Sequence, residues 1–242
     1  MSAAETVIRE VTRNVWTFST PFARFGFFPI GGRSTAIKLR DGDIWVFAST
    51  PLNEPTKSKL DSIGAVKYLV APDGVHHLYI NEFKKAYPNA KVLGVEPLVE
   101  KKKKEGLIFD GVYGVDSADT KYGFEDEIKA CYFSGHQNKD VAFMHNESKS
   151  LIVADLLFNL PPTEQYSQSS SSASLPFVGS LGPFGSVHKR LVSLVASDKA
   201  AMKKEATTVA NWDFDRIIPC HGDVIETDGN KAWREAYKAF ID

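Results

Sequence analysis

The sequence has few cysteines, little net charge and no long apolar run, and each shortage excludes a class of protein. Its 242 residues include only Cys131 and Cys220, which cannot form a disulfide framework. Lysine plus arginine (29) nearly balances aspartate plus glutamate (30), so there is no electrostatic reason to expect a nucleic acid or an anionic membrane as partner. No apolar run approaches the roughly 20 residues that span a bilayer, and residues 1–14 lack the apolar core of a signal peptide. We therefore expect a cytoplasmic protein with reduced thiols and no membrane partner.

Two further absences narrow the choice of architecture. The chain has no internal repeat, and no predicted strand leads into a Gly-x-Gly-x-x-Gly turn, which argues against a Rossmann nucleotide site. Hydrophobic residues make up 43% and charged residues 24% of the chain, an ordinary globular composition. We expect a single domain over residues 1–242.

Apolar periodicity predicts strands first and alternating helices and strands afterwards. Strands are expected at 15–18, 34–39 and 43–48, the last two joined by a turn at Asp41-Gly42. Helices are expected at 54–63, 77–87, 97–105, 199–210 and 231–240, and further strands at 66–70, 91–95, 128–133, 141–145, 151–154 and 216–219. This order is typical of mixed α/β packing with helices that cover a sheet.

Two segments stand out from this pattern. Residues 161–187 contain a serine-rich tract that carries too little apolar surface for a strand or helix, so we expect a flexible insertion there, either a mobile loop or an active-site lid. Residues 21–29 contain four phenylalanines. They are expected either to pack in the core and its rim or to form an apolar wall above a substrate pocket.

Histidine and aspartate side chains follow four β-rich runs, at the point where each run ends. The runs near 68–70, 130–133, 151–154 and 217–220 lead, in turn, into Asp73 with His76 and His77, into His136, into Asp155, and into His221. Residues just past strand ends gather at one edge of an α/β sheet, where imidazoles and carboxylates can converge on a metal ion. Taken singly, each histidine could be a surface residue, Asp155 could cap a helix, and Cys220 could be a thiolate ligand or an inert buried thiol. Their joint occurrence favours a metal site.

At these residues the sequence resembles the metallo-β-lactamase superfamily, over roughly Val15 to His221. The resemblance rests on Ser134-Gly135-His136, on Leu151 to Phe158 around Asp155, and on Ile218-Pro219-Cys220-His221-Gly222, which match the superfamily's later ligand motifs in order and spacing. It implies an αββα sandwich of two mixed sheets flanked by helices. It also implies one or two divalent metal ions, most simply zinc, with Asp155 as the carboxylate that bridges two ions.

The first ligand motif departs from the superfamily's Thr-His-x-His-x-Asp-His. Aligned on His77, the two leading histidines become Pro72 and Gly74, and His76 replaces the aspartate. The resemblance then implies a first metal position with His136, Asp155 and Asp73, and a second with His76, His77, Asp155 and His221. A single ion, or iron or manganese in place of zinc, is also compatible with mixed histidine and carboxylate ligands. Where the superfamily has a supporting aspartate, this chain has Ser49 and Thr50.

The leading hypothesis is a metal-dependent hydrolase that acts on a small ester, lactone, amide or phosphoester. The metal would lower the pKa of a bound water from about 16 toward about 7, which makes hydroxide available as nucleophile. His76 and Asp73 are the expected catalytic residues, with Asp73 as ligand or general base, and His188 is expected either at the surface or reaching the pocket. The alternatives are a non-hydrolytic, iron-dependent oxidoreductase and a binding module without catalysis.

Overall fold

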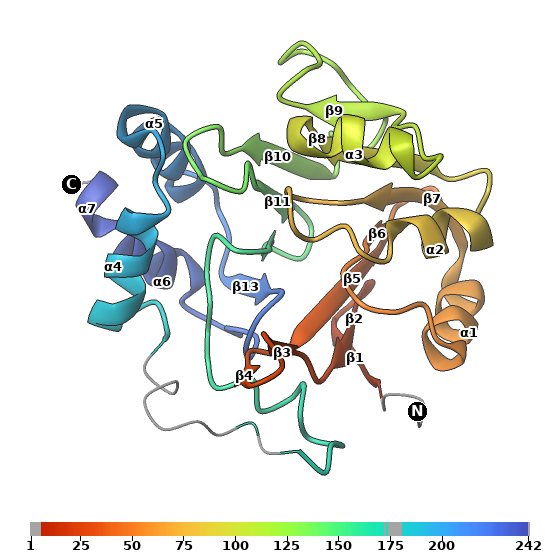
Figure 1. The fold of residues 1–242 in the computed structure, drawn as a ribbon, viewed down its shortest axis with the longest axis horizontal. Helices are drawn as coiled ribbons and strands as arrows, with labels where there is room; N and C mark the ends of the chain where they lie inside the picture. The colour runs from red at the N-terminus through yellow and green to blue at the C-terminus, as the bar shows by residue number, and fades with distance from the viewer. Residues whose placement is uncertain (1–5, 172, 174–180, 242) are drawn as a thin grey trace.

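Two β-sheets pack face to face, with helices on both outer sides (Figure 1). The computed structural model describes residues 6–171, 173 and 181–241. The larger sheet has the strand order β1 (Val7–Thr12), β2 (Val15–Thr20), β5 (Gly32–Lys38), β6 (Asp43–Phe47), β7 (Ala65–Val70), β8 (Lys91–Val95) and β9 (Gly111–Tyr113). The smaller sheet has the order β10 (Ile128–Tyr132), β11 (Val141–His145), β12 (Ser150–Val153) and β13 (Arg216–Pro219). This is the predicted αββα sandwich.

Both sheets are mixed, and their parallel parts position the site. In the larger sheet β1, β2, β5 and β6 pair antiparallel, whereas β6, β7, β8 and β9 pair parallel. In the smaller sheet β12 pairs with β13 in parallel, with Val153 opposite Pro219. The carboxyl ends of β7, β12 and β13 therefore lead into the loops that carry the predicted ligands.

The helices divide between the two outer faces. One side of the sandwich carries α1 (Glu54–Ile63), α2 (Ile80–Ala86), the short 3₁₀ helix η1 (Glu96–Leu98) and α3 (Val99–Lys104); the other carries α4 (Ser186–Leu194), α5 (Lys199–Ala210), α6 (Gly229–Ala236) and α7 (Lys238–Ile241) (Figure 1). No helix among the described residues is long and apolar enough to cross a membrane.

Two apolar cores hold these layers together. Between the sheets, Trp45 of β6 meets Phe143 of β11 edge to face, with ring centroids 5.1 Å apart and both side chains fully buried. Between the smaller sheet and its helices, Trp233 stacks on Tyr237 at 4.2 Å, and Phe133 packs against both rings. Aromatic pairs of this kind add to the area term of burial, so they anchor the layers firmly.

Helix boundaries agree with the prediction where a side chain caps the helix. Asn53 accepts a hydrogen bond from the backbone N–H of Thr56 and starts α1, and Asp198 does the same for α5 through Ala200 and Ala201. The helix expected from residue 77 begins only at Ile80, without a side-chain cap, and the C-terminal helix breaks at Tyr237 into α6 and α7. Strand β9 and helix α4 were not predicted.

The insertion expected at 161–187 is only partly described. Residues 172 and 174–180, which include part of the serine-rich tract, lie outside the described residues. The first part of the segment packs against the sandwich, because Gln165 is fully buried and Tyr166 nearly so. Helix α4 begins at Ser186, within the range that was expected to lack regular structure.

Candidate metal centre

His76 is held by a carboxylate from its own loop, just after β7. Asp73 is fully buried, and one of its carboxylate oxygens accepts hydrogen bonds from the backbone N–H groups of Val75 and His76, both at 2.7 Å. Its other oxygen lies 2.8 Å from His76 Nδ1. Burial alone would raise the pKa of Asp73, but the positive charge of His76 and these hydrogen bonds outweigh it and lower the pKa. Because the ionised carboxylate can only accept, Nδ1 of His76 keeps its proton and donates it in this hydrogen bond, and the lone pair of the neutral ring is on Nε2.

His221 reaches the same place from the end of β13 and is oriented in the same way. Its Nδ1 lies 2.6 Å from the carbonyl oxygen of Gly31, which can only accept, so Nδ1 carries the proton and Nε2 the lone pair. The ring lies between Phe158, stacked at 5.2 Å, and Phe22 at 6.3 Å. Burial, followed by the nearby charge of His76, lowers the pKa of His221 to about 4.

The two Nε2 atoms face each other, and this geometry fits a cation. They are 3.0 Å apart, and each ring has committed its Nδ1 proton elsewhere. Two lone pairs at this distance repel unless a proton or a metal ion lies between them. Burial lowers the pKa of His76, but the carboxylates of Asp73 and Asp155 outweigh it and raise the pKa well above its usual value. Two imidazole nitrogens on one tetrahedral zinc ion lie about 3.3 Å apart, close to the spacing seen here.

Asp155, at the end of β12, adds a carboxylate oxygen that lacks a partner. Its Oδ2 accepts a hydrogen bond from the Asn138 amide at 2.7 Å, while the buried Oδ1 has none among the described residues and lies 3.6 Å from His221 Nε2. The backbone N–H of Asp155 donates to the buried Asp140 carboxylate at 2.8 Å, which fixes the turn after β12. A buried carboxylate oxygen without a hydrogen bond is costly, and a bound cation would remove that cost.

Two overlapping groups of potential ligands result, and His76 belongs to both. The first group is Asp73, His76 and Asp155; the second is His76, Cys220 and His221, and within each group the donor atoms lie within 4.8 Å of one another. Cys220 Sγ also lies 3.2 Å from the hydroxyl of Ser49. The structure thus brings Asp73, His76, Asp155 and His221 together, as expected from the sequence. It also places Cys220 beside them, for which the sequence left a thiolate ligand and an inert buried thiol open.

His77 and His136 are not in these groups. His77 Nε2 lies 2.8 Å from Lys101 Nζ, and burial together with the charges of Lys102 and Lys101 lowers the pKa of His77. His136 follows β10 in the loop before β11; its Nε2 is buried and has no partner among the described residues, and its Nδ1 accepts from the backbone of Asn138. His136 is thus free to act as a ligand near Asp155. His77 Nδ1 is also buried and has no partner among the described residues, so the ligand role of His77 stays a prediction.

His188 is not at the surface, so the expectation of a surface residue was wrong, and it is absent from the described linings of the two cavities beside the ligand cluster. It is fully buried on α4, and its Nε2 accepts the backbone N–H of Phe158 at 3.0 Å. Burial lowers the pKa of His188 to about 4, so the ring is neutral at pH 7. Its part is to hold Phe158, whose ring packs on His221.

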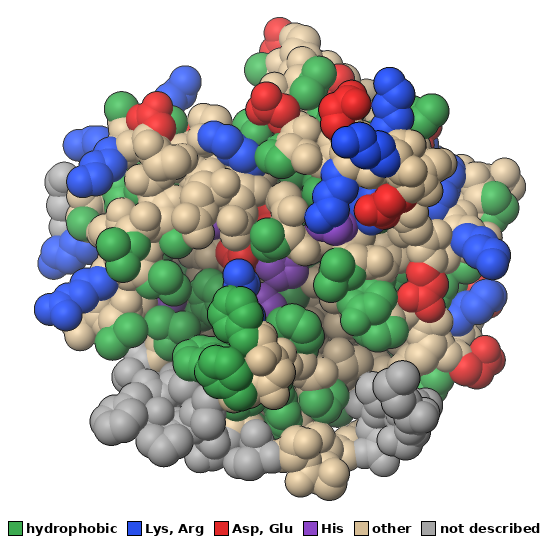
Figure 2. Space-filling model, in the orientation of Figure 1, with side chains coloured by type: hydrophobic (Ala, Val, Ile, Leu, Met, Phe, Trp, Pro, Cys, Tyr) green, Lys and Arg blue, Asp and Glu red, His purple; other side chains and the backbone are tan. Residues whose placement is uncertain are grey.

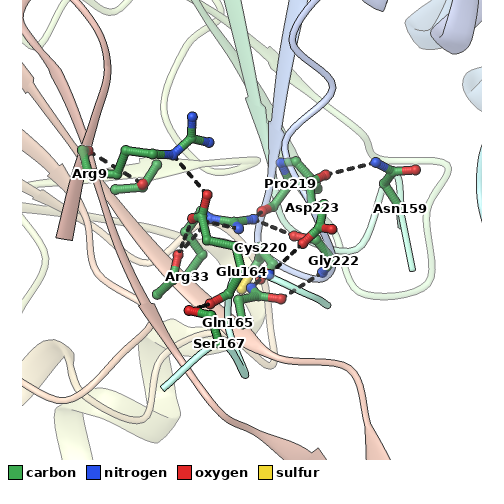
Figure 3. Close-up of polar contacts among 12 residues, drawn as sticks. Arg9, Arg33, Asn159, Glu164, Gln165, Ser167, Pro219, Cys220, Gly222 and Asp223 are labelled. Atoms are coloured by element: carbon green, nitrogen blue, oxygen red, sulfur yellow. Dashed lines mark hydrogen bonds and ion pairs between the residues drawn. The ribbon is translucent and has the colours of Figure 1, made fainter. Parts of the chain in front are cut away.

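A buried arginine that the sequence analysis did not single out braces the loop of His221. Arg33 of β5 donates to the carbonyl oxygens of Pro219 at 2.7 Å and Gly222 at 2.6 Å, and its guanidinium also contacts Ser19 and Glu164 (Figure 3). Burial lowers the pKa of Arg33, opposed by the negative charge of Glu164.

Gln165, the residue after Glu164, also holds the loop of His221 through hydrogen bonds. Its amide donates to the Cys220 carbonyl at 2.7 Å and accepts from the Gly222 N–H at 2.9 Å (Figure 3). Gly31 makes room for it, because a Cβ at that position would lie 1.9 Å from the Gln165 side-chain oxygen.

Residues of the ligand cluster line two cavities. The first, of about 250 Å³, is lined by His76, His77, Cys220 and His221 together with Phe22 and Ser49. The second, of about 330 Å³, is lined by His136, Asn138 and Asp155 together with apolar side chains such as Phe28, Phe158 and Leu191. Figure 2 shows histidine side chains near the centre of this face, with hydrophobic side chains gathered beside them. The arrangement is that of a polar reactive centre in an apolar binding site.

Comparison with known proteins agrees with this fold. A family model described as a domain of unknown function (DUF4336) matches residues 13–177, more than half of the chain. No curated relative matches the sequence.

Among solved structures, a metallo-β-lactamase from Pontibacter korlensis superposes with a TM-score of 0.62 at 12% identity, over 98% of this chain and 99% of that one. A metallo-β-lactamase from Erythrobacter litoralis, with beta mercaptoethanol in its active site, superposes with a TM-score of 0.64 at 14% identity, over 98% of this chain and 97% of that one. The metallo-β-lactamase FIM-1 from Pseudomonas aeruginosa, in a mono-zinc form, superposes with a TM-score of 0.61 at 12% identity, over 98% of this chain and 97% of that one. At these identities the likeness establishes the fold.

Proposed function

The chain belongs to the family described as a domain of unknown function (DUF4336) and has the metallo-β-lactamase fold, and from this premise we propose that it is a metal-dependent hydrolase of small molecules. One observation carries the proposal. The Nε2 lone pairs of His76 and His221 face each other at 3.0 Å, near an oxygen of Asp155 that has no hydrogen bond among the described residues. His76 and His221 line one cavity and Asp155 another.

His76, Asp155 and His221 would hold the ion, with Cys220 or His136 completing the ligand set. Nitrogen, oxygen and sulfur donors together suit zinc better than iron or manganese. With Pro72 and Gly74 in place of two histidines, and His77 turned toward Lys101, one ion per chain is the simplest arrangement. A zinc ion bound there would supply Lewis-acid chemistry, polarising a carbonyl or phosphoryl oxygen and making water more acidic.

Asp73 is better suited to orient His76 than to act as ligand or general base. All its hydrogen-bonding capacity toward the loop is used, and it is fully buried, so it cannot reach a proton on a substrate. A carboxylate that accepts the Nδ1 proton of a ligating histidine fixes the tautomer and strengthens the other nitrogen as a donor. Asn138 plays a similar part for Asp155, because its amide holds one carboxylate oxygen and leaves the other free.

The walls of the two cavities would bind the apolar part of a substrate and keep water away from the centre. Phe22 and Phe158 enclose the ring of His221, and Phe28 and Leu191 line the second cavity. An apolar wall on both sides of a polar centre favours a substrate with an apolar body on either side of the reacting bond. Water exclusion also strengthens the electrostatic interactions between the centre and the substrate.

The test combines metal analysis with a substrate panel. Freshly purified protein should contain about one zinc per chain, and His221→Ala and Asp155→Ala should each lose it, because each removes one of the three ligands proposed to hold the ion. His77→Ala is the matched control: it removes a histidine adjacent in sequence to His76 whose ring points to Lys101, and it should retain the metal.

The same preparation is then assayed on esters, lactones, amides and phosphoesters. Turnover of one class, lost in His221→Ala and kept in His77→Ala, supports hydrolysis. Metal retained in both ligand variants would mean that the ligand set is wrong. Stoichiometric metal without turnover of any class would refute the proposed hydrolysis, and iron content with oxygen consumption would then point to the oxidoreductase.

A further inference from the structure

A short hairpin over the ligand cluster carries a cation whose part is not explained by the metal centre. Strands β3 (Ala23–Arg24) and β4 (Phe28–Pro29) pair with Arg24 opposite Phe28. The turn between them places Phe25 and Gly26 at positive φ, 56° and 80°. A phenylalanine in this conformation is strained, and such strain is most often found where function requires the local geometry.

The base of the hairpin is joined to the metal ligand His221. The carbonyl oxygen of Phe22 accepts the backbone N–H groups of Ile30 and Gly31 at 3.0 and 2.9 Å, and the carbonyl oxygen of Gly31 in turn accepts from His221 Nδ1. The Tyr166 hydroxyl donates to the same Phe22 oxygen at 2.9 Å. The hairpin is therefore tied to the centre at its base, and Arg24 extends from it two residues beyond Phe22.

Arg24 lines both cavities, and it is the only lysine or arginine in the described lining of either. Its guanidinium lies 5.4 Å from the centroid of the Phe25 ring and forms no ion pair or hydrogen bond with any residue that the structure describes. Figure 2 shows basic side-chain atoms beside the histidines of this face, next to a gathering of hydrophobic side chains. Arg24 thus offers one exposed positive charge at the edge of both cavities, beside the apolar side chains of their linings.

The acidic groups of the site cannot serve as partners for this charge. Asp73 is committed to His76 and to two backbone N–H groups, and Asp155 to Asn138 and the metal centre. A guanidinium presents a planar fork that binds a carboxylate or a phosphate through two parallel hydrogen bonds. Apart from the proposed metal centre itself, Arg24 is the one lysine or arginine of the described cavity linings that can pair with an anionic group on a ligand.

We propose that Arg24 binds an anionic group, a carboxylate or a phosphate, of a substrate whose apolar body lies in the two cavities. This inference rests on the proposed hydrolase function and narrows it to anionic small molecules. Arg24 is then a residue that determines specificity and takes no part in the chemical step, so its removal should raise KM for anionic substrates and leave kcat nearly unchanged.

The first experiment measures binding alone. The dissociation constants of 3-phenylpropanoate, 3-phenylpropanamide and phenyl phosphate are measured by NMR titration for wild type, Arg24→Gln and Arg13→Gln. Arg13 is an exposed arginine in the turn between β1 and β2, outside both cavity linings, and is the matched control. The wild type and Arg13→Gln should bind the acid about fivefold more tightly than the amide at low salt, which is the upper range for an exposed ion pair such as Arg24 would form. The preference should vanish in Arg24→Gln and weaken in concentrated salt.

Comparing the acid with phenyl phosphate shows which anion the site favours, and a preference for either over the amide supports the proposal. An unchanged preference in Arg24→Gln would overturn it, since the metal or another group would then bind the anion. Equal affinity of the wild type for acid, phosphate and amide would also overturn it.

Failure of this inference can be told apart from failure of the hydrolase proposal. Turnover of neutral esters, with an anion preference that ignores Arg24, refutes only the role of Arg24. An Arg24-dependent preference without turnover on any substrate refutes hydrolysis and leaves the anion site in place. Where anionic esters are turned over, Arg24→Gln should raise their KM about fivefold and leave neutral esters unaffected.

Discussion

Replacing Arg33 by methionine removes the guanidinium that braces the loop of His221. In the folded protein this side chain is fully buried and donates to the carbonyl oxygens of Pro219 and Gly222, on either side of Cys220-His221, and to Glu164. Methionine retains much of the apolar stem but makes none of these contacts. The variant therefore leaves the two carbonyl oxygens without the guanidinium that donates to them, and Glu164 without one of its three partners.

The magnitude follows from these contacts. Removing one partner of a buried ion pair costs about 3–5 kcal/mol. Glu164 keeps Arg9 at 2.8 Å and Ser19 at 2.8 Å, so the lower end of that range applies. The two carbonyls left without a donor add about 1 kcal/mol or somewhat less each, since some water can reach the loosened loop. We expect a loss of about 4 kcal/mol in the free energy of unfolding.

The assay is urea denaturation followed by fluorescence, paired with zinc affinity measured against a chelating dye. Zinc affinity should fall about 10-fold to 100-fold, the usual effect of losing a group that orients a metal ligand. Arg33→Lys, which keeps the charge but lacks the fork, should lose about half as much stability and still fold. Arg9→Met is the control, because Arg9 pairs with Glu164 from a half-exposed position and should cost less than about 1 kcal/mol.

The reasoning fails if Arg33→Met lowers the free energy of unfolding by less than about 1 kcal/mol, no more than Arg9→Met. It also fails if stability falls as expected while zinc affinity is unchanged in both Arg33 variants. That result would show that Arg33 stabilises the sandwich without positioning His221.

Three further predictions concern metal, pH and a buried lysine. Zinc at about 100 times its dissociation constant should stabilise the protein by about 2.7 kcal/mol, seen as a higher Tm that a chelator reverses; a Tm indifferent to both would contradict a resident metal. Burial lowers the pKa of His188 to about 4 in the folded protein, from about 6.5 in the unfolded chain, so its contribution to the free energy of unfolding is complete above pH 6.5 and falls by about 3 kcal/mol on acidification to pH 4. His188→Gln should flatten this part of the stability profile, and an unchanged slope would refute the assignment. Lys102 is buried, and its described partner Glu105, 2.7 Å away, is half-exposed, so Lys102→Met should change the free energy of unfolding by less than about 1 kcal/mol. A loss above about 2 kcal/mol in urea denaturation would show that the ion pair stabilises the fold.

The position of the centre in the fold could be predicted from the sequence because it depends on strand ends. Asp155 follows β12 and His221 follows β13, and these strands pair in parallel with Ile152 opposite Ile218. Parallel neighbours deliver the residues beyond their ends to one edge whatever the loops do, so apolar runs followed by polar residues were sufficient evidence. The helix at 54–63 was predictable for a similar reason, because its cap Asn53 lies next to it in the chain.

Side-chain direction within the loops could not be predicted in this way. His76 and His77 are adjacent and were assigned alike, yet one ring faces His221 and the other Lys101. Their directions depend on partners 145 and 24 residues away, which a local pattern cannot identify. Cys220 joined the group of potential ligands for the same reason, since only the packing of its loop against Ser49 brings its sulfur to the centre.

The sequence by itself therefore determined which strands end in ligand-type residues and that those ends share an edge, because short-range apolar patterning specifies strands and strands specify direction. Only the tertiary structure decided that Arg33 braces the His221 loop and that Arg24 stands free over both cavities. Arg33 bonds to residues 186 and 189 positions away, and an arginine in a strand has no local signal that separates burial from exposure. What such a charge does is set by which distant groups the packed fold places around it.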